Sequence, residues 1–181
     1  MPTKITVNAA SADSLSKAAE RIRKYQMALA NKNRDFVKEL AKTGIEEISK
    51  SLGVDPQYDD EYKEEMPQYN HPHVFAGSKD GEMSATLKLT GPNAVFVEFG
   101  AGVHYNTPAG QSPHPLGEEF GYTIGSYGHG QGANDSWSYT KDGTTRLSHG
   151  TQALMPMWNA SQEIRQEAVG KAKSIFSIKG I

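Results

Sequence analysis

Hydrophobic and polar residues alternate most regularly between Ser84 and Gly102, and this pattern predicts the centre of the fold. Every second residue is apolar on both sides of a short turn, which is typical of strands with one buried face. The turn, Gly91-Pro92-Asn93, contains a proline that can continue neither strand, so it favours an antiparallel hairpin. The apolar positions of the two expected strands are Ala85, Leu87 and Leu89, followed by Val95, Val97 and Phe99.

The residues before this hairpin repeat at helical spacing and predict a first helix. Apolar side chains recur every three or four residues between Leu15 and Leu29, which is the spacing of an amphipathic helix over about residues 13–30. Ser11 or Asp13 can cap its N-terminus, because a short oxygen-bearing side chain accepts a hydrogen bond from the first turn. The polar sequence Asn31-Lys32-Asn33 is expected to interrupt the helix.

A second N-terminal helix is expected after this interruption. The apolar pattern resumes at Phe36 and continues to Leu52. Gly53 follows, and a glycine in this position commonly ends a helix because it adopts a left-handed conformation without strain. The helix should therefore end at Gly53.

The C-terminal part of the chain predicts a third helix and a second hairpin. Residues 156–177 repeat apolar side chains at helical spacing, and Pro156 suits a first helical turn. We expect the apolar face of this helix to cover the strand of Val95, Val97 and Phe99. The Asp142-Gly143 sequence predicts a type I′ turn between two strands within residues 137–147.

These elements predict an α+β fold in one domain, residues 1–181, with an antiparallel sheet, two N-terminal helices and one long C-terminal helix. Residues 103–150 form a long insertion rich in glycine and aromatic residues. Eleven of the chain's 18 glycines lie between Gly100 and Gly150. Loops of this length are normally functional or disordered, and the aromatic residues favour a surface that contacts other subunits or a partner.

The composition excludes several classes of protein. The chain has 181 residues, with 19 Lys and Arg against 21 Asp and Glu, so it lacks the overall basic charge of a dedicated DNA-binding protein. It contains no cysteine, which excludes disulfides and thiol chemistry. No apolar segment is long enough for a signal peptide or a membrane span, so a protein made in a cytoplasm without membrane attachment is expected.

Charge is distributed unevenly along the chain. Residues 11–50 carry nine basic and six acidic side chains, most of them expected on the polar faces of the helices. Residues 55–66 carry six acidic side chains and only Lys63 as a basic one, and their spacing does not match a calcium-binding loop. This acidic segment is expected to be a mobile loop or an interaction loop.

Few residues are candidates for chemistry. Glu98 is the one acidic residue within the central strand, and we expect it to accept hydrogen bonds from backbone or from an adjoining subunit rather than to act in catalysis. Four of the six histidines lie in the insertion, among them His104, His114 and His129, and His71-Pro72-His73 forms a further pair. No motif with the spacing of zinc ligands is present. The glycine-rich residues 125–132 lack the flanking elements of a phosphate-binding loop. Neither a metal nor a cofactor is therefore expected.

Two motifs and their order resemble the tail-component family of tailed bacteriophages. The first is Val97-Glu98-Phe99-Gly100-Ala101-Gly102. The second covers residues 149–160, HGTQALMPMWNA, and leads into the C-terminal helix. Between them lie the glycine- and aromatic-rich insertion and the Asp142-Gly143 hairpin. The resemblance extends over about residues 11–177.

This resemblance implies an assembly function rather than an enzyme. Members of the family are neck or tail-completion proteins at the head–tail junction. The chain would then be a subunit of a ring, commonly of six copies, that assembles in the host cytoplasm and becomes part of the virion. It would join the connector or head-closure protein to the tail terminator or tail tube and let DNA pass without sequence recognition. The expected contact residues are Glu98, Phe99, Tyr105, Phe120, Tyr122, Tyr127, Trp137 and Tyr139, and the acidic segment would lie at the lumen or rim.

Two other functions stay open from the sequence. A small hydrolase could use Glu98 together with His104 or His129 as a general acid and base. A carbohydrate-binding module could use Trp137, Tyr139 and Tyr127 as a platform on which sugar rings stack.

Overall fold

The computed structural model describes residues 7–8, 11–55, 71–79, 82–91, 94–101, 112–122, 137–148 and 150–177. Within these ranges the chain is α+β, as the sequence predicts. The elements in chain order are α1 (Ala12–Leu52), β1 (His71–Lys79), β2 (Glu82–Thr90), α2 (Ala94–Phe99), β3 (Trp137–Lys141), β4 (Thr144–Ser148) and α3 (Pro156–Phe176).

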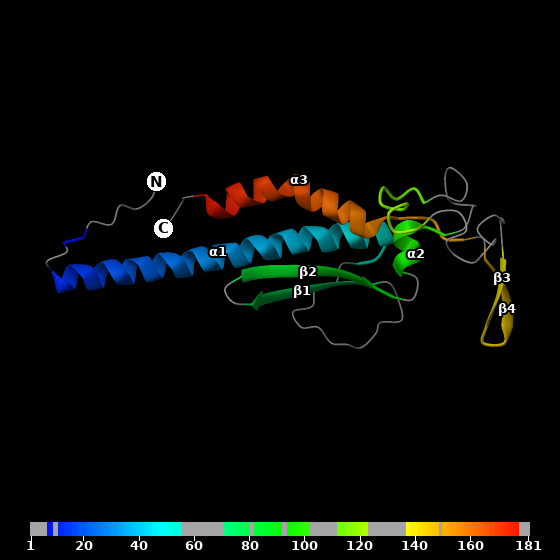
Figure 1. Ribbon diagram of the computed structural model, residues 1–181, viewed down its shortest axis with the longest axis horizontal. Coiled ribbons are helices and arrows are strands. Elements are labelled where there is room, and N and C mark those ends of the chain that lie inside the picture. The colour runs from blue at the N-terminus through cyan, green and yellow to red at the C-terminus, as the bar shows by residue number, and fades with distance from the viewer. Residues whose placement is uncertain are drawn as a thin grey trace.

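One helix of 41 residues, α1, replaces the two predicted N-terminal helices. At a rise of 1.5 Å per residue it is about 60 Å long, and it sets the elongated shape seen in Figure 1. The predicted caps are correct, because the backbone N–H of Ser14 donates to the Ser11 hydroxyl and Gly53 adopts a φ of 65°. The predicted interruption at Asn31-Lys32-Asn33 is wrong. Asparagine lowers helix stability by less than about 1 kcal/mol, too little to stop a helix that continues on both sides.

The predicted central hairpin is also wrong. β2 pairs in antiparallel register with the upstream strand β1, from His71 opposite Thr90 to Lys79 opposite Glu82. The sequence after Gly91-Pro92-Asn93 forms the short helix α2 instead of a strand. The chain therefore reverses direction before β2, between Lys79 and Glu82, and residues 71–79 form the partner strand.

α1 lies between the two other main layers, with α3 on one side and the β1–β2 hairpin on the other (Figure 1). The predicted contact between α3 and a strand containing Val95, Val97 and Phe99 is therefore wrong. Side chains of α1 form the centre of this arrangement, and Ile45 and Ile48 are fully buried. Gly44 allows the close approach, because a Cβ atom there would collide with Leu87 of β2 and Ile164 of α3.

α3 runs antiparallel to α1 and covers only its C-terminal half. The contacts run from Asn159, whose amide donates to the Ser51 hydroxyl at 3.4 Å, to Phe176, whose ring centroid lies 5.8 Å from that of Phe36. The N-terminal part of α1 continues past the end of α3, as Figure 1 shows.

The second hairpin has the predicted turn. β3 pairs with β4 from Trp137 opposite Ser148 to Lys141 opposite Thr144. Asp142 and Gly143 have φ values of 54° and 71°, and a type I′ turn requires positive φ at both positions. Figure 1 shows this hairpin at the end of the molecule opposite the N-terminus of α1. None of the described helices is long and apolar enough to cross a lipid bilayer.

Candidate functional site

The candidate site is the buried carboxylate of Glu98, which connects α2 to the start of α3. Its Oε2 accepts a hydrogen bond from the Met157 backbone N–H at 2.8 Å. Its Oε1 accepts one from the Trp158 backbone N–H, also at 2.8 Å. Glu98 is separated from these residues by about 60 positions in the sequence but occupies the place of a helix cap.

The start of α3 needs such an acceptor from elsewhere in the chain. The first N–H groups of a helix have no partner within the helix, and they carry a partial positive charge that attracts an anion. Met155 stands in the N-cap position and makes no side-chain cap, while Pro156 has no N–H to satisfy. Glu98 accepts from the next two donors, and Asn159 makes the first bond within the helix, to the Met155 carbonyl at 2.9 Å.

Backbone hydrogen bonds join the same two segments on either side of Glu98. The Val97 carbonyl accepts from the N–H groups of Leu154 at 2.8 Å and Met155 at 3.4 Å. Ala101 and Thr151 exchange both of their backbone hydrogen bonds as an antiparallel bridge, at 2.8 and 2.9 Å. We call this unit, formed by residues 97–101 and 151–158, the Glu98 junction.

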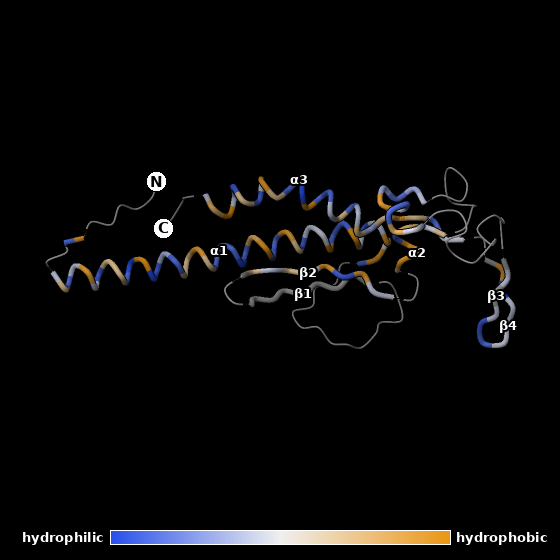
Figure 2. The backbone as a smooth tube through the Cα atoms, viewed as in Figure 1, coloured by the Kyte–Doolittle hydropathy of each residue, from blue (hydrophilic) through white to orange (hydrophobic). Residues whose placement is uncertain are grey.

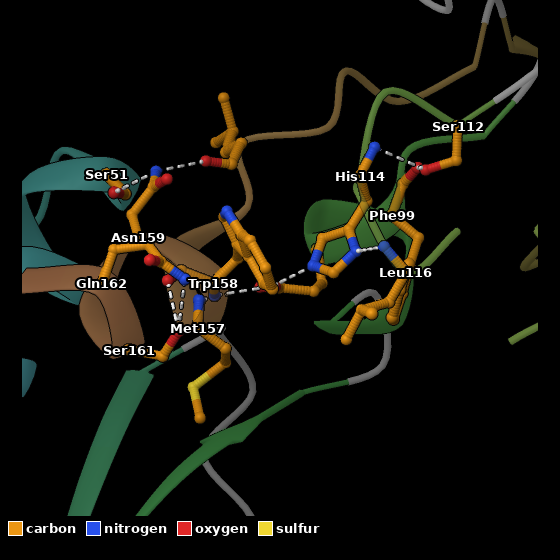
Figure 3. Close-up of polar contacts among 12 residues, drawn as sticks. Ser51, Phe99, Ser112, His114, Leu116, Met157, Trp158, Asn159, Ser161 and Gln162 are labelled. Carbon is orange, nitrogen blue, oxygen red and sulfur yellow. Dashed lines mark hydrogen bonds and ion pairs between the residues drawn. The ribbon is translucent and has the colours of Figure 1, made fainter. Parts of the chain in front are cut away.

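His114 adds a third donor to Glu98 from the long insertion. Its Nε2 lies 3.1 Å from Glu98 Oε1, and both side chains are buried. Its Nδ1 accepts from the Leu116 backbone N–H at 3.0 Å. Because Nδ1 acts as an acceptor, the ring proton is on Nε2 and is donated to the carboxylate. Figure 3 shows the His114 ring between Trp158 and Leu116.

Aromatic rings surround this contact, with Phe99 at their centre. Phe99 stacks on Tyr122 with ring centroids 4.1 Å apart and an interplanar angle of 12°. It also lies 4.4 Å from the ring of His114 and 5.7 Å from that of Phe120. The His114 ring in turn meets Trp158 edge-on at 5.4 Å. These contacts hold the insertion against α2 and α3.

Residues 112–122 form a closed loop that positions His114. The Ser112 N–H donates to the Tyr122 carbonyl at 3.2 Å, and the Ser112 hydroxyl donates to the Phe99 carbonyl. Inside the loop, the Gly117 N–H donates to the His114 carbonyl at 2.8 Å. A Cβ atom at Gly117 would lie 2.7 Å from the Cβ of Ser112, so the tight loop needs glycine there.

The structure brings four of the predicted contact residues into or beside the Glu98 junction. Glu98, Phe99 and Tyr122 contact other parts of the same chain, as described above. Phe120 also touches Phe99 but keeps 58% of its surface exposed. The prediction that Glu98 accepts backbone hydrogen bonds is confirmed, with donors from α3.

The side chains of the other predicted contact residues lie outside the described part of the structure. Trp137 and Tyr139 belong to β3, but their side chains lie outside the described part of the structure. Tyr105, Tyr127, the acidic residues 56–66 and the glycine-rich residues 125–132 lie outside the described residues, as do His104 and His129. Their predicted contacts stay predictions.

Sequence reasoning missed two parts of the site. It did not connect Glu98 with His114, because their spacing of 16 residues matches no known motif. Nothing in the sequence distinguished His114 from His104 or His129. It also missed the cap on α3. An available signal was the helix start Met155-Pro156, which offers neither a capping side chain nor an N–H at its first position.

The geometry of Glu98 is that of a structural acceptor. Each carboxylate oxygen receives a donor from the same chain, and Oε1 receives two. A buried carboxylate that accepts several hydrogen bonds holds its donors in place and orders the backbone around it. Among the described residues, no group of three or more His, Asp or Glu side chains is placed to hold a metal ion.

Comparisons with protein-family models, curated proteins and solved structures found no match to this chain.

Proposed function

We propose that this chain is a structural subunit of the head–tail junction of a tailed bacteriophage. In this role it forms a ring, commonly of six copies, as a neck or tail-completion protein of the virion. One face of the ring binds the connector or head-closure protein, and the other binds the tail terminator or tail tube. DNA passes through the lumen without sequence recognition.

The Glu98 junction is the observation that carries this proposal. The resemblance to phage tail components depends on two motifs about 60 residues apart, around Glu98 and Met157. In the fold these motifs lie against each other, joined by the Glu98 carboxylate and by four backbone hydrogen bonds of Val97 and Ala101. Residues that depend on one another structurally are expected to occur together in a family, so their contact supports the resemblance.

The shape of the molecule also suits a ring subunit. A closed ring uses heterologous contacts, in which two different surfaces of each copy meet. The N-terminal end of α1 and the β3–β4 hairpin lie at opposite ends of the molecule and offer two such surfaces (Figure 1). Both strands of this hairpin have unpaired backbone edges within the described residues, and such edges can accept a strand from a neighbour.

The charge is compatible with a DNA conduit. The formal net charge is −2 at pH 7, so the chain as a whole does not attract the phosphate backbone strongly. A passage through which DNA must slide gains nothing from tight binding. No described contact favours the hydrolase or the carbohydrate-binding alternative over this function, and we do not propose either.

A deletion in the phage or prophage genome that encodes the chain tests the function. We expect electron micrographs of the lysate to show DNA-filled heads and finished tails that are not joined. Supplying the wild-type chain from a plasmid should restore complete virions. Normal yields of infectious, complete virions without the chain would contradict the proposal.

A further inference from the structure

The N-terminal half of α1 exposes three large apolar side chains on one face. Ile22, Tyr25 and Leu29 are 39–51% exposed, although they lie in an ordered helix. They are spaced by three and four residues, which places them side by side on the helix surface. Ala18 precedes them on the same side and is buried, so the exposed surface begins after it. α3 does not cover this surface, because it ends beside Phe36. Figure 2 shows apolar residues continuing along α1 beyond the region that α3 covers.

A basic border lies along one side of these apolar residues. At about 100° per residue, Arg21 and Lys32 fall on the same side of their centre and within about 80° of it. Neither forms an ion pair within the described part of the chain. We call this surface the α1 face; it consists of Arg21, Ile22, Tyr25, Leu29 and Lys32.

The acidic residues in this half of α1 lie on the other side of the helix. Asp13 pairs there with Lys17, and Glu20 with Lys24, each with a nitrogen–oxygen distance of 2.7 Å. Both carboxylates fall about 150° or more from the centre of the α1 face. The α1 face of a second copy would therefore bring no acidic side chain to the basic border. A complementary occupant combines an apolar side chain with acidic ones.

The loop of residues 112–122 presents this combination. Glu118, Glu119 and Phe120 follow one another and are all exposed, Phe120 over 58% of its surface. Neither glutamate forms an ion pair among the residues that the structure describes. Residues 112–122 contain no lysine or arginine that could neutralise them. We call residues 118–120 the loop tip.

Backbone hydrogen bonds hold the loop tip in one conformation. The Phe120 N–H donates to the Leu116 carbonyl at 3.1 Å, and the Gly121 N–H donates to the Glu118 carbonyl at 3.0 Å. The Phe120 ring also lies against Phe99, with centroids 5.7 Å apart. An exposed aromatic ring on an ordered loop loses little conformational freedom when it binds, which suits an anchor residue of an interface.

A copy cannot bring its loop tip to its own α1 face. The loop packs through His114 on Trp158 at the start of α3, and the next residue, Asn159, contacts Ser51 near the end of α1. Tyr25 precedes Ser51 by 26 residues, which is about 39 Å at 1.5 Å per residue. Figure 1 shows residues 112–122 beside α2, away from the N-terminal half of α1. The loop tip on the α1 face must therefore come from another copy.

We propose that the loop tip of one subunit docks on the α1 face of the adjacent subunit. Phe120 packs on the apolar side chains of that face, and Glu118 and Glu119 approach its basic border. The contact is heterologous, because two different surfaces meet, and it therefore suits a closed ring. It specifies one subunit contact of the assembly proposed above and rests on that proposal.

Sedimentation velocity of the full-length chain tests this contact. We compare the wild type with two variants that each reverse one arginine charge, two residues apart on α1. Arg21→Glu changes the border of the α1 face. Arg23→Glu is the matched control, because Arg23 lies about 130° from the centre of that face. We expect Arg21→Glu to weaken self-association at least about tenfold and Arg23→Glu less than about twofold, with unchanged helix content by circular dichroism.

A charge exchange gives the test a positive arm. Arg21→Glu with Lys32→Glu should abolish association, and so should Glu118→Lys with Glu119→Lys in a separate chain, because like charges then meet at every contact. Mixing the two variant chains should restore association. One contact then joins two unchanged surfaces and the next joins two exchanged surfaces, so species larger than a dimer require both.

Three results would overturn the inference. They are equal effects of Arg21→Glu and Arg23→Glu, no restoration of the larger species on mixing, and a wild type that stays monomeric at all concentrations.

These outcomes are separable from failure of the proposed function. If deletion of the chain leaves heads and tails unjoined but the Arg21→Glu variant assembles as the wild type does, the function stands and the contact is wrong. If the chain self-associates through the α1 face but complete virions form without it, the contact stands and the function is wrong.

Discussion

Replacing Glu98 should destabilise the protein more than replacing any exposed glutamate. Glu98→Ala removes the acceptor for three donors, the Met157 and Trp158 N–H groups and His114 Nε2. Glu98→Gln keeps the shape of the side chain. It removes the negative charge and turns one acceptor oxygen into an NH₂ group, which cannot accept a hydrogen bond from a backbone N–H.

The magnitude follows from what each variant leaves unpaired. A buried donor without an acceptor costs about 1–3 kcal/mol, and Glu98→Ala leaves three such donors. We therefore expect Glu98→Ala to lower the free energy of unfolding by about 3–5 kcal/mol. For Glu98→Gln we expect about 2–3 kcal/mol, since one hydrogen bond and the attraction of the carboxylate to the helix N-terminus are lost.

Equilibrium unfolding in urea measures this effect. Far-ultraviolet circular dichroism reports on the helices, and tryptophan fluorescence reports partly on Trp158, which contacts His114. Glu118→Gln is the matched control, because Glu118 is exposed in the same part of the chain as His114 and its loss should change stability by less than about 0.5 kcal/mol. A Glu98→Gln variant as stable as this control would refute the capping role.

Three further predictions concern packing and charge. Gly44→Val should lower the free energy of unfolding by about 1–3 kcal/mol in urea titrations, because the added side chain collides with Leu87. Gly117→Ala should lower it by a similar amount, about 1–3 kcal/mol, by opening the loop around His114. The pKa of Glu167 lies below its ordinary value because of hydrogen bonds from Lys171 and Thr43. Its stabilising effect is therefore present above the ordinary carboxyl pKa and is lost as the pH falls through the lowered value. Lys171→Met should raise that pKa in a carbon-13 NMR titration.

The ends of the helices could be predicted from sequence because their signals are local. Ser11 caps α1 through a residue three positions away, and Gly53 ends it through its own backbone conformation. The turn at Asp142-Gly143 likewise depends on two residues that tolerate positive φ. In each case the residue types at a few neighbouring positions determine the conformation of those same positions.

The errors came from elements whose state is decided by distant contacts. Residues 94–99 alternate like a strand, but a six-residue segment is too short for periodicity to separate strand from helix. The helix is held by the bonds of Val97 and Glu98 to residues 154–158, which local patterns do not show. No sequence pattern indicated β1, because it contains Pro72 and proline is rare inside strands. A two-stranded sheet leaves an edge on each strand where proline is tolerated.

Cryo-electron microscopy of complete virions would test the central claim most directly. We expect density at the head–tail junction that fits several copies of the chain, each recognisable by its 41-residue helix, arranged in a closed ring around the DNA path. Virions in which this chain is absent, or in which it lies away from the junction, would contradict the claim.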